Sequence, residues 1–195
     1  MPIAAPSPRL AELSARRSSQ GATVWFTGLP SAGKSTLAQE VAVRLVETGR
    51  RVELLDGDVV RKELCSDLGF SRADREENIS RIGYLAGRLA RHGVIVLAAV
   101  IAPYESARRA VRVRHERQEL PYIEAYVATP LTVCRARDVK GLYAKQEAGQ
   151  LQGLTGVDDV YEPPAAPELV LHTQHSTVEQ SVDQVMRALA ARGLV

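Results

Sequence analysis

The sequence predicts an α/β fold in which a mostly parallel, five-stranded sheet carries helices on both faces, giving three layers. Short β-rich runs alternate with segments of helical periodicity along most of the chain. One run, residues 94–101, is apolar without interruption, which is typical of a strand buried on both faces. A glycine-rich turn at 28–33 joins the first strand to the first helix. Because helical crossovers connect parallel strands, this order favours a parallel sheet.

The first half of the chain alternates strands and helices. Leu37, Val41 and Leu45 recur at helical spacing and predict a helix that Gly49 terminates. Ser71 and Asp74 have the spacing of a capping box and open a long helix. The predicted elements are a strand at 23–27, a helix at 34–48, a strand at 51–55, a helix at 59–68, and the long helix up to Gly93.

The second half repeats the alternation around one long irregular segment. Residues 138–167 are rich in glycine, proline and charge, and this length without periodicity indicates a lid or binding loop. Thr177 and Gln180 form a second capping box for the last helix, which runs to Gly193. The other predicted elements are a strand at 94–101, a helix at 106–118, a strand at 122–127, a helix from Pro130 to Arg137, and a strand at 168–171.

Length and composition predict one globular domain. The chain has 195 residues, a formal net charge of +2, 45% hydrophobic and 25% charged residues, which excludes disordered, collagen-like and disulfide-rich classes. The near-neutral charge argues against a nucleic-acid partner. We expect a flexible tail at 1–21, with one short helix around 10–17, and one folded domain at 22–195 whose lid spans about 138–163.

Neither membrane insertion nor secretion is expected from the sequence. The longest apolar run, 94–102, is far shorter than the roughly 20 residues of a membrane helix. The N-terminal residues lack the apolar stretch of a signal peptide. Two cysteines, Cys65 and Cys134, show no metal-binding or disulfide pattern, and the four histidines are scattered. These features predict a cytoplasmic protein.

The strongest motif is a phosphate-binding loop. Gly28 to Ser35 fits GxxxxGK[ST] in full, with a predicted strand before it and a helix after it. Backbone N–H groups of such a loop surround a phosphate, Lys34 reaches the β- and γ-phosphates, and Ser35 offers an oxygen to Mg²⁺. The motif predicts a three-layer P-loop NTPase fold that binds ATP and Mg²⁺. The expected ATP-binding residues are Gly28, Leu29, Pro30, Ser31, Ala32, Gly33, Lys34, Ser35 and Thr36.

The phosphate-binding loop alone leaves several classes open: motors, GTPases, small-molecule kinases and nucleotide sensors. The chain is too short for most motor machinery, and an NKxD-type guanine signature is absent. The small size and the lid-like segment favour phosphoryl transfer to a small acceptor.

Six further motifs occur in order along the chain: Leu55-Asp-Gly-Asp-Val-Val-Arg61, Asp67-Leu-Gly-Phe-Ser71, Asp74-Arg-Glu-Glu-Asn78-Ile79, Asp138-Val-Lys-Gly-Leu-Tyr143, Leu154-Thr-Gly156 and Tyr161-Glu-Pro-Pro164. Together with the phosphate-binding loop, they make the chain resemble the adenylylsulfate kinase (APS kinase) family over about residues 20–172. The resemblance implies transfer of the γ-phosphoryl group of ATP to the 3′-hydroxyl of adenosine 5′-phosphosulfate (APS), giving PAPS and ADP. It also implies that the chain forms a homodimer. The alternatives are a kinase for a related nucleotide or small alcohol, and a nucleotide-binding regulatory homologue with weakened turnover.

Two carboxylates follow the second predicted strand, at the sheet edge where α/β proteins bind ligands. The resemblance places Asp58 at the acceptor hydroxyl, where it deprotonates or orients that group. Asp56 is expected to support Ser35 or the water shell of Mg²⁺, so Ser35 and Asp56 form the predicted metal site. The alternative is that one of the two carboxylates caps the next helix.

The resemblance also assigns residues to the acceptor and to the lid. Lys140 is expected to close over the phosphates from the lid and Arg137 to pack on the ATP base; Lys34, Asp58 and Lys140 are the predicted catalytic residues. Arg109 is the best candidate for a substrate contact in the arginine-rich helix at 106–118. The predicted substrate-binding residues are Asp58, Arg61, Phe70, Arg75, Asn78, Ile101, Lys140 and Leu154.

Three positions depart from the pattern of the family. Ala102 stands where the family often has serine, so a phosphoserine there is impossible and direct in-line transfer is the expected route. Leu154 replaces a common phenylalanine, which predicts weaker stacking on the acceptor base. Val59 replaces a frequent asparagine and removes one polar contact.

Overall fold

The protein is described by a computed structural model over residues 20–195, where five strands and seven helices form three layers. The strands are β1 (Ala22–Thr27), β2 (Val52–Asp56), β3 (Ile95–Ala99), β4 (Tyr122–Val127) and β5 (Leu169–Leu171). The helices are α2 (Lys34–Glu47), α3 (Gly57–Leu64), α4 (Arg72–Ala90), α5 (Glu105–Glu116), α6 (Leu131–Arg137), α7 (Leu142–Glu147) and α8 (Val178–Ala190). The expected short helix in the tail lies outside the described residues.

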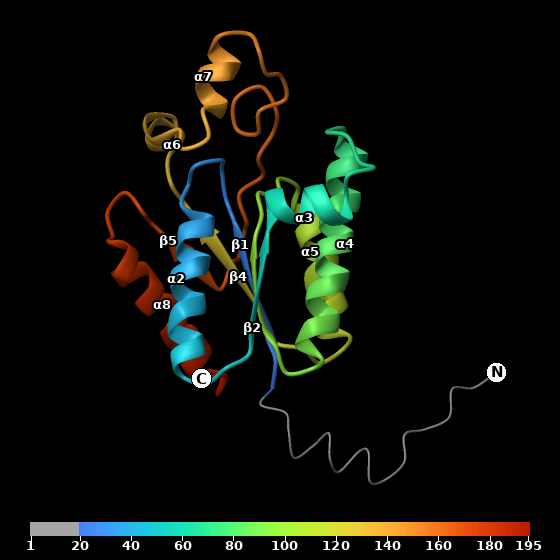
Figure 1. Ribbon diagram of the computed structural model, residues 1–195, viewed down its shortest axis with the longest axis vertical. Helices are drawn as coiled ribbons and strands as arrows, with labels where there is room; N and C mark the ends of the chain where they lie inside the picture. The colour runs from blue at the N-terminus through green and yellow to red at the C-terminus, as the bar shows by residue number, and fades with distance from the viewer. Residues whose placement is uncertain (1–19) are drawn as a thin grey trace, which may run out of the picture.

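The sheet is parallel throughout, with the strand order β2-β3-β1-β4-β5. Figure 1 shows α2 and α8 on one face of this sheet and α3, α4 and α5 on the other. Residues 138–163, which the sequence predicts to form a lid and which are called the lid segment below, extend with α6 and α7 beyond one end of the sheet. The predicted three-layer α/β fold is confirmed.

The central strand β1 shows why the sequence has continuous apolar runs. All six residues of β1 are buried, because helices cover both faces of the sheet. Val24 and Phe26 belong to the core cluster that includes residues of α2 and α8, whereas Trp25 packs in the cluster with α4 and α5. A parallel sheet between two helical layers has no solvated face on its central strands.

Both predicted capping boxes are present. The Ser71 hydroxyl accepts the N–H of Asp74 at the start of α4, and the Thr177 hydroxyl accepts the N–H of Gln180 at the start of α8. In each box the residue at the third helical position bonds back to the backbone of the capping residue. Local sequence therefore determines where these two helices begin.

Two helices differ from the prediction. The helix predicted for 59–68 is α3, which starts at Gly57 and ends at Leu64. Arginine side chains donate hydrogen bonds to the carbonyls at and after the end of this helix. Arg81 donates to the carbonyl of Leu64, and Arg61 donates to the carbonyls of Leu68 and Gly69. Those carbonyls are thus satisfied without a further helical turn.

Helix α7 was not predicted within the irregular segment. It has six residues, too few for a periodic signal, and starts after Gly141. The Asp138 carboxylate accepts the N–H groups of Tyr143 and Ala144 at 3.1 and 3.0 Å. The buried Tyr143 hydroxyl donates to the carbonyl of Pro30 at 3.0 Å, which ties the lid segment to the glycine-rich turn.

None of the helices within residues 20–195 is both long and apolar enough to cross a membrane.

Candidate active site

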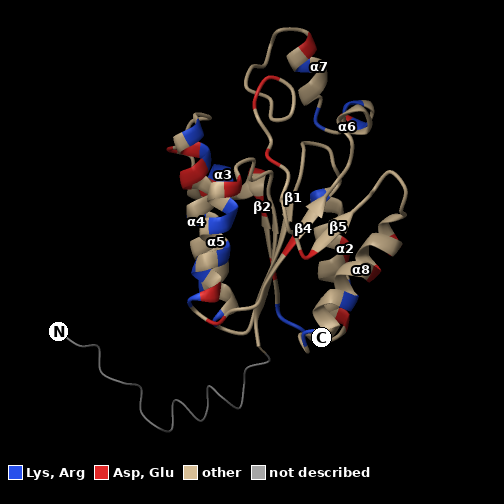
Figure 2. Cartoon of the chain, turned by 180° about the vertical axis from the view of Figure 1, so that it is seen from behind, with Lys and Arg blue, Asp and Glu red and all other residues tan. Residues whose placement is uncertain are grey.

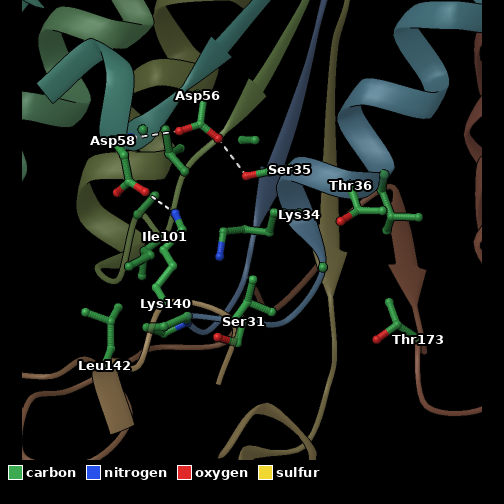
Figure 3. Close-up of a pocket in the computed structure, with 18 of the residues that line it drawn as sticks. Ser31, Lys34, Ser35, Thr36, Asp56, Asp58, Ile101, Lys140, Leu142 and Thr173 are labelled. Atoms are coloured by element: carbon green, nitrogen blue, oxygen red, sulfur yellow. Dashed lines mark hydrogen bonds and ion pairs between the residues drawn. The ribbon is translucent and has the colours of Figure 1, made fainter. Parts of the chain in front are cut away.

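A cavity opens at the carboxyl ends of the parallel strands (Figure 3). Its lining comes from six segments: residues 30–37, the start of α3, the N-terminal half of α4, the loop after β3, the beginning of the lid segment, and the stretch that leads into α8. In a parallel α/β sheet this end is where loops from separate crossovers meet. The cavity therefore collects side chains that are far apart in sequence.

The phosphate-binding loop has the backbone geometry that its glycines permit. Gly28 and Gly33 have φ angles of 150° and 107°, and a Cβ on Gly28 would lie 2.6 Å from the carbonyl oxygen of Val127. The Lys34 ammonium donates to the carbonyls of Gly28 and Leu29 at 2.9 and 2.7 Å. Burial lowers the pKa of Lys34 to about 8, from its ordinary value of 10.5.

Asp56 makes both contacts that the sequence left open for the pair of carboxylates. One oxygen, Oδ2, accepts the Ser35 hydroxyl at 2.6 Å, and the other, Oδ1, accepts the N–H of Asp58 at 3.0 Å and caps α3. Partial burial raises the pKa of Asp56, but the hydrogen bonds from Ser35 and Asp58 outweigh it, so the pKa is lowered overall. Asp56 is therefore a fixed, ionised carboxylate beside the phosphate-binding loop.

Asp58 and Lys140 form an ion pair across the cavity, one from α3 and the other from the lid segment (Figure 3). Their side chains are 63% and 53% exposed. Exposed ion pairs contribute little to stability, so this contact can be exchanged for others when a ligand enters. Lys34 projects toward the same space from the other side of the cavity (Figure 3).

A second group of residues lines the cavity beside α3 and α4. The Arg61 guanidinium lies 4.3 Å from the centre of the Phe70 ring, and Phe70 itself is 70% exposed. Asn78 is buried, and its Oδ1 has no hydrogen-bond partner among residues 20–195. A buried amide oxygen without a donor is costly and suits a ligand that supplies one.

Arg75 joins α4 to the lid segment. Its guanidinium donates to the carbonyl of Gly153 at 2.7 Å and to the hydroxyl of Thr155 at 3.1 Å, and lies 3.2 Å from the Asp159 carboxylate. Its Nε also bonds the carbonyl of Phe70 at 3.0 Å. Arg75 therefore fixes the position of this part of the lid beside the cavity.

The β3–α5 loop, residues 100–104, contributes Ile101 and Ala102 to the lining. Ala102 is buried and has a φ of 46°, a left-handed conformation that costs energy for a residue with a Cβ. Arg109 on α5 is exposed and lies outside the lining, contrary to its selection as a substrate contact. Its neighbour Arg108 is buried instead.

Leu154 is the one predicted substrate-binding residue that does not line the cavity; of the predicted ATP-binding residues, Gly28, Leu29 and Ala32 do not line it either. Leu154 is 5% exposed and packs in the core cluster with Leu29 and Val157. The core already buries this apolar side chain, and its contact with a substrate base stays a prediction.

The stretch before α8 was missed as a lining element. Thr173, Ser176 and Thr177 line the cavity, and Arg137 donates to the hydroxyl and carbonyl of Thr173 at 2.8 and 3.0 Å. The position directly after β5, at the carboxyl end of the sheet, was a usable signal. The sequence analysis assigned no binding role to this stretch.

A magnesium ion suits Ser35 and Asp56. Their oxygens are hard donors of the kind that Mg²⁺ prefers, and the ion normally takes few protein ligands together with water and phosphate oxygens. Among residues 20–195 there is no cluster of three or more His, Cys, Asp or Glu side chains that could hold a metal. The oxygens of Ser35 and Asp56 therefore fit a Mg²⁺ that is held jointly by protein, water and phosphate.

The chain is similar in sequence to known members of one family. Residues 20–172 match the family model described as adenylylsulphate kinase. An adenylyl-sulfate kinase of Synechococcus sp. (strain JA-2-3B'a(2-13)) is 52% identical over 178 residues, covering 91% of this chain and 99% of the relative. That of Myxococcus xanthus is 50% identical over 177 residues, covering 91% and 95%.

Solved structures agree with these sequence matches. The Mycobacterium tuberculosis APS kinase in complex with AMPPNP and APS superposes with a TM-score of 0.85 and is 40% identical, covering 88% of this chain and 98% of that chain. The hexameric APS kinase of Thiobacillus denitrificans has a TM-score of 0.70 and 36% identity, covering 95% of this chain and 32% of that longer chain.

Proposed function

The chain belongs to the adenylylsulphate kinase family, and we propose that it phosphorylates the 3′-hydroxyl of APS in a single in-line step. It is an adenylyl-sulfate kinase, an ATP-using enzyme of sulfate assimilation that makes PAPS from APS. One observation carries the proposed mechanism. Lys34 in a complete phosphate-binding loop and the Asp58–Lys140 pair face each other across one cavity.

The donor half binds the phosphates of ATP. The loop and the first turn of α2 supply backbone N–H groups and the positive end of a helix dipole. Lys34 exchanges its two carbonyl acceptors for phosphate oxygens, and Arg137 packs beside the base. Ser35 and Asp56 would hold Mg²⁺, which neutralises charge on the β- and γ-phosphates when it is bound.

The acceptor half binds and orients APS. Asp58 accepts the proton of the 3′-hydroxyl, while Lys140 moves from the Asp58 carboxylate to the migrating phosphoryl group. Arg61 and Arg75 supply guanidinium groups for the phosphosulfate, and the exposed Phe70 ring stacks on the adenine. Asn78 offers its unpaired amide oxygen to the adenine amino group.

The transfer proceeds without a phosphoenzyme. The 3′-oxygen forms a bond to the γ-phosphorus as the bond from that phosphorus to the β–γ bridging oxygen breaks, leaving ADP, and the hydroxyl proton passes to Asp58. Ala102 has no hydroxyl with which to carry the phosphoryl group. One displacement inverts the configuration at phosphorus.

Two measurements test this function. Purified protein should release ADP only when both ATP and APS are present, with one PAPS formed for each ADP. Transfer from a γ-phosphorothioate of ATP made chiral with oxygen isotopes should give inverted product. Retention of configuration would require a covalent intermediate and would contradict the in-line step. Release of ADP with a different nucleotide or alcohol, but not with APS, would show that APS is not the acceptor.

We also propose that the chain acts in the cytoplasm as a homodimer. Both described cysteines are free and buried, which suits a reducing compartment. Light scattering of the purified chain tests the assembly: a mass of two chains supports the proposal, and a monomer or hexamer contradicts it.

A further inference from the structure

We propose that Arg108 is a positioning residue for the acceptor half of the site, because its guanidinium fixes the β3–α5 loop to the end of the lid segment from beneath the cavity. The proposal rests on the proposed function. Arg108 does not line the cavity and is 2% exposed, so it acts through the backbone that it holds and not on a substrate.

The guanidinium of Arg108 reaches three separate parts of the chain. Its Nη1 donates to the carbonyl of Ala102 at 2.7 Å, and its Nη2 donates to the carbonyl of Glu162 at 2.7 Å. Its Nε lies 3.0 Å from a carboxylate oxygen of Glu124 on β4. A planar fork with donors in fixed directions is required for this, and a lysine ammonium cannot span the same partners.

Ala102 is the residue that most needs such support. Its left-handed backbone persists only if the surroundings hold it, and Arg108 takes the carbonyl of this residue. The preceding carbonyl, of Ile101, accepts the Thr27 hydroxyl at 2.5 Å. With both carbonyls bound to protein donors, the backbone of Ile101 and Ala102 that faces the acceptor has one fixed orientation.

Two further hydrogen bonds, both made by Glu162, connect the lid segment to the β3–α5 loop and to the start of α5. The N–H of Glu162 donates to the carbonyl of Pro103 at 2.8 Å, and the Glu162 carboxylate accepts the N–H of Glu105 at 2.7 Å. That carboxylate caps α5, whose own capping residue, Tyr104, makes no side-chain cap. Arg108 lies at the centre of this junction, so the two walls of the acceptor half are positioned together.

Glu124 gives the buried guanidinium its counter-charge. Glu124 is 7% exposed and also lies 3.3 Å from Arg112, which in turn pairs with Glu168 at 2.6 Å. Arg112 therefore shares the charge network of Arg108 without touching the β3–α5 loop or the lid segment. Both arginines lie on α5, which Figure 2 shows as a helix rich in basic residues next to α4.

The test compares Arg108→Lys with the matched control Arg112→Lys. Arg108→Lys keeps a positive charge opposite Glu124 but loses the fork, and we expect the KM for APS to rise roughly ten-fold with the KM for ATP unchanged. Arg112→Lys should leave both KM values unchanged. The double variant Arg108→Met/Glu124→Gln removes both charges, which avoids an unpaired buried charge, and should raise the KM for APS in the same way.

Hydrogen exchange tests the positioning role without reference to turnover. The backbone N–H groups of residues 100–102, Tyr104, Tyr161 and Glu162 should exchange faster in Arg108→Lys than in the unaltered chain, and not in Arg112→Lys. Unchanged exchange together with an unchanged KM for APS, or an equal effect of Arg112→Lys on both, would overturn the proposal. Failure of the unaltered chain to turn over APS would instead contradict the proposed function, whatever the exchange shows.

Discussion

The two halves of the active site hold the same kinds of charged groups in different surroundings. In the donor half, Lys34 is 8% exposed and Asp56 is fixed by hydrogen bonds from Ser35 and the start of α3. In the acceptor half, the side chains of Lys140 and Asp58 are more than half exposed and contact chiefly each other. The donor half is thus set in place by the sheet, whereas the acceptor half depends on contacts between distant segments. Changes in the donor half should affect the use of ATP most, and changes in the residues that hold APS should affect APS binding. Loss of the proposed base, Asp58, should instead lower turnover itself.

Among the residues proposed to bind the two substrates, the largest effect is expected from Lys34→Met. The substitution removes the charge that follows the γ-phosphoryl group, so kcat/KM for ATP should fall roughly 10²–10³-fold. Steady-state kinetics at saturating APS give this value. Thermal stability at neutral pH should not fall, because burial already disfavours the charged form of Lys34. A variant that unfolds, or that keeps normal kinetics, would contradict the description of the donor half.

Arg75→Ala is expected to have the next largest effect, on the acceptor half. It removes a guanidinium proposed to bind the phosphosulfate and breaks the bonds to Gly153 and Asp159. The KM for APS should rise roughly 10–100-fold, in line with the loss of charge-assisted hydrogen bonds. Limited proteolysis should also cut the lid segment faster. Equal losses for ATP and APS would show that the two halves are not separable.

The pH dependence tests the burial of Lys34. The free enzyme should lose the Lys34 proton as pH rises through about 8, since burial lowers the pKa of this group. We expect kcat/KM for ATP to decrease about ten-fold per pH unit above that point. The effect on stability has the opposite sign: between pH 8 and 10.5 the folded state deprotonates first, so the cost of burying a charge fades as pH rises. Lys34→Arg should move the kinetic decline to higher pH, and a flat profile of the unaltered enzyme up to pH 10 would exclude this role of burial.

The smallest effect is expected from Phe70→Leu. The ring is 70% exposed and lies over Arg61, so its loss should not change the melting temperature. Loss of stacking on the adenine is worth about 0.5–1.5 kcal/mol, which raises the KM for APS by roughly 2–13-fold. Inhibition by adenine nucleotides that lack the sulfate checks the base contact, and an unchanged KM for APS would remove Phe70 from the site.

Much of the fold was predictable because its signals are local. The apolar run of β3, the two capping boxes and the glycine-rich turn each determine a short stretch of backbone without reference to the rest of the chain. The end of α3 and the whole of α7 were not predictable in this way. Arginine side chains from α3 and α4 satisfy the carbonyls after Leu64, and Asp138 caps a helix of only six residues.

The residues of the site likewise differ in whether a local sequence signal predicts them. The phosphate-binding loop follows from one contiguous motif, and Asp56 and Asp58 follow from the end of β2. The substrate residues of the acceptor half were predicted only through the resemblance to a family, because no local pattern brings Arg75 to Gly153 or Lys140 to Asp58. Arg108 was passed over in favour of Arg109, since periodicity alone does not show which arginine of an arginine-rich helix is buried.

The most direct test of the account is Asp58→Asn, which removes the proposed proton acceptor without changing the size of the side chain. We predict that kcat falls roughly 10²–10⁴-fold, because the 3′-hydroxyl loses its base. Calorimetry should show ATP binding unchanged, since the donor half is held by Lys34, Ser35 and Asp56. Near-normal turnover of Asp58→Asn would contradict the account, as would a loss of ATP binding that accounts for the whole loss of turnover.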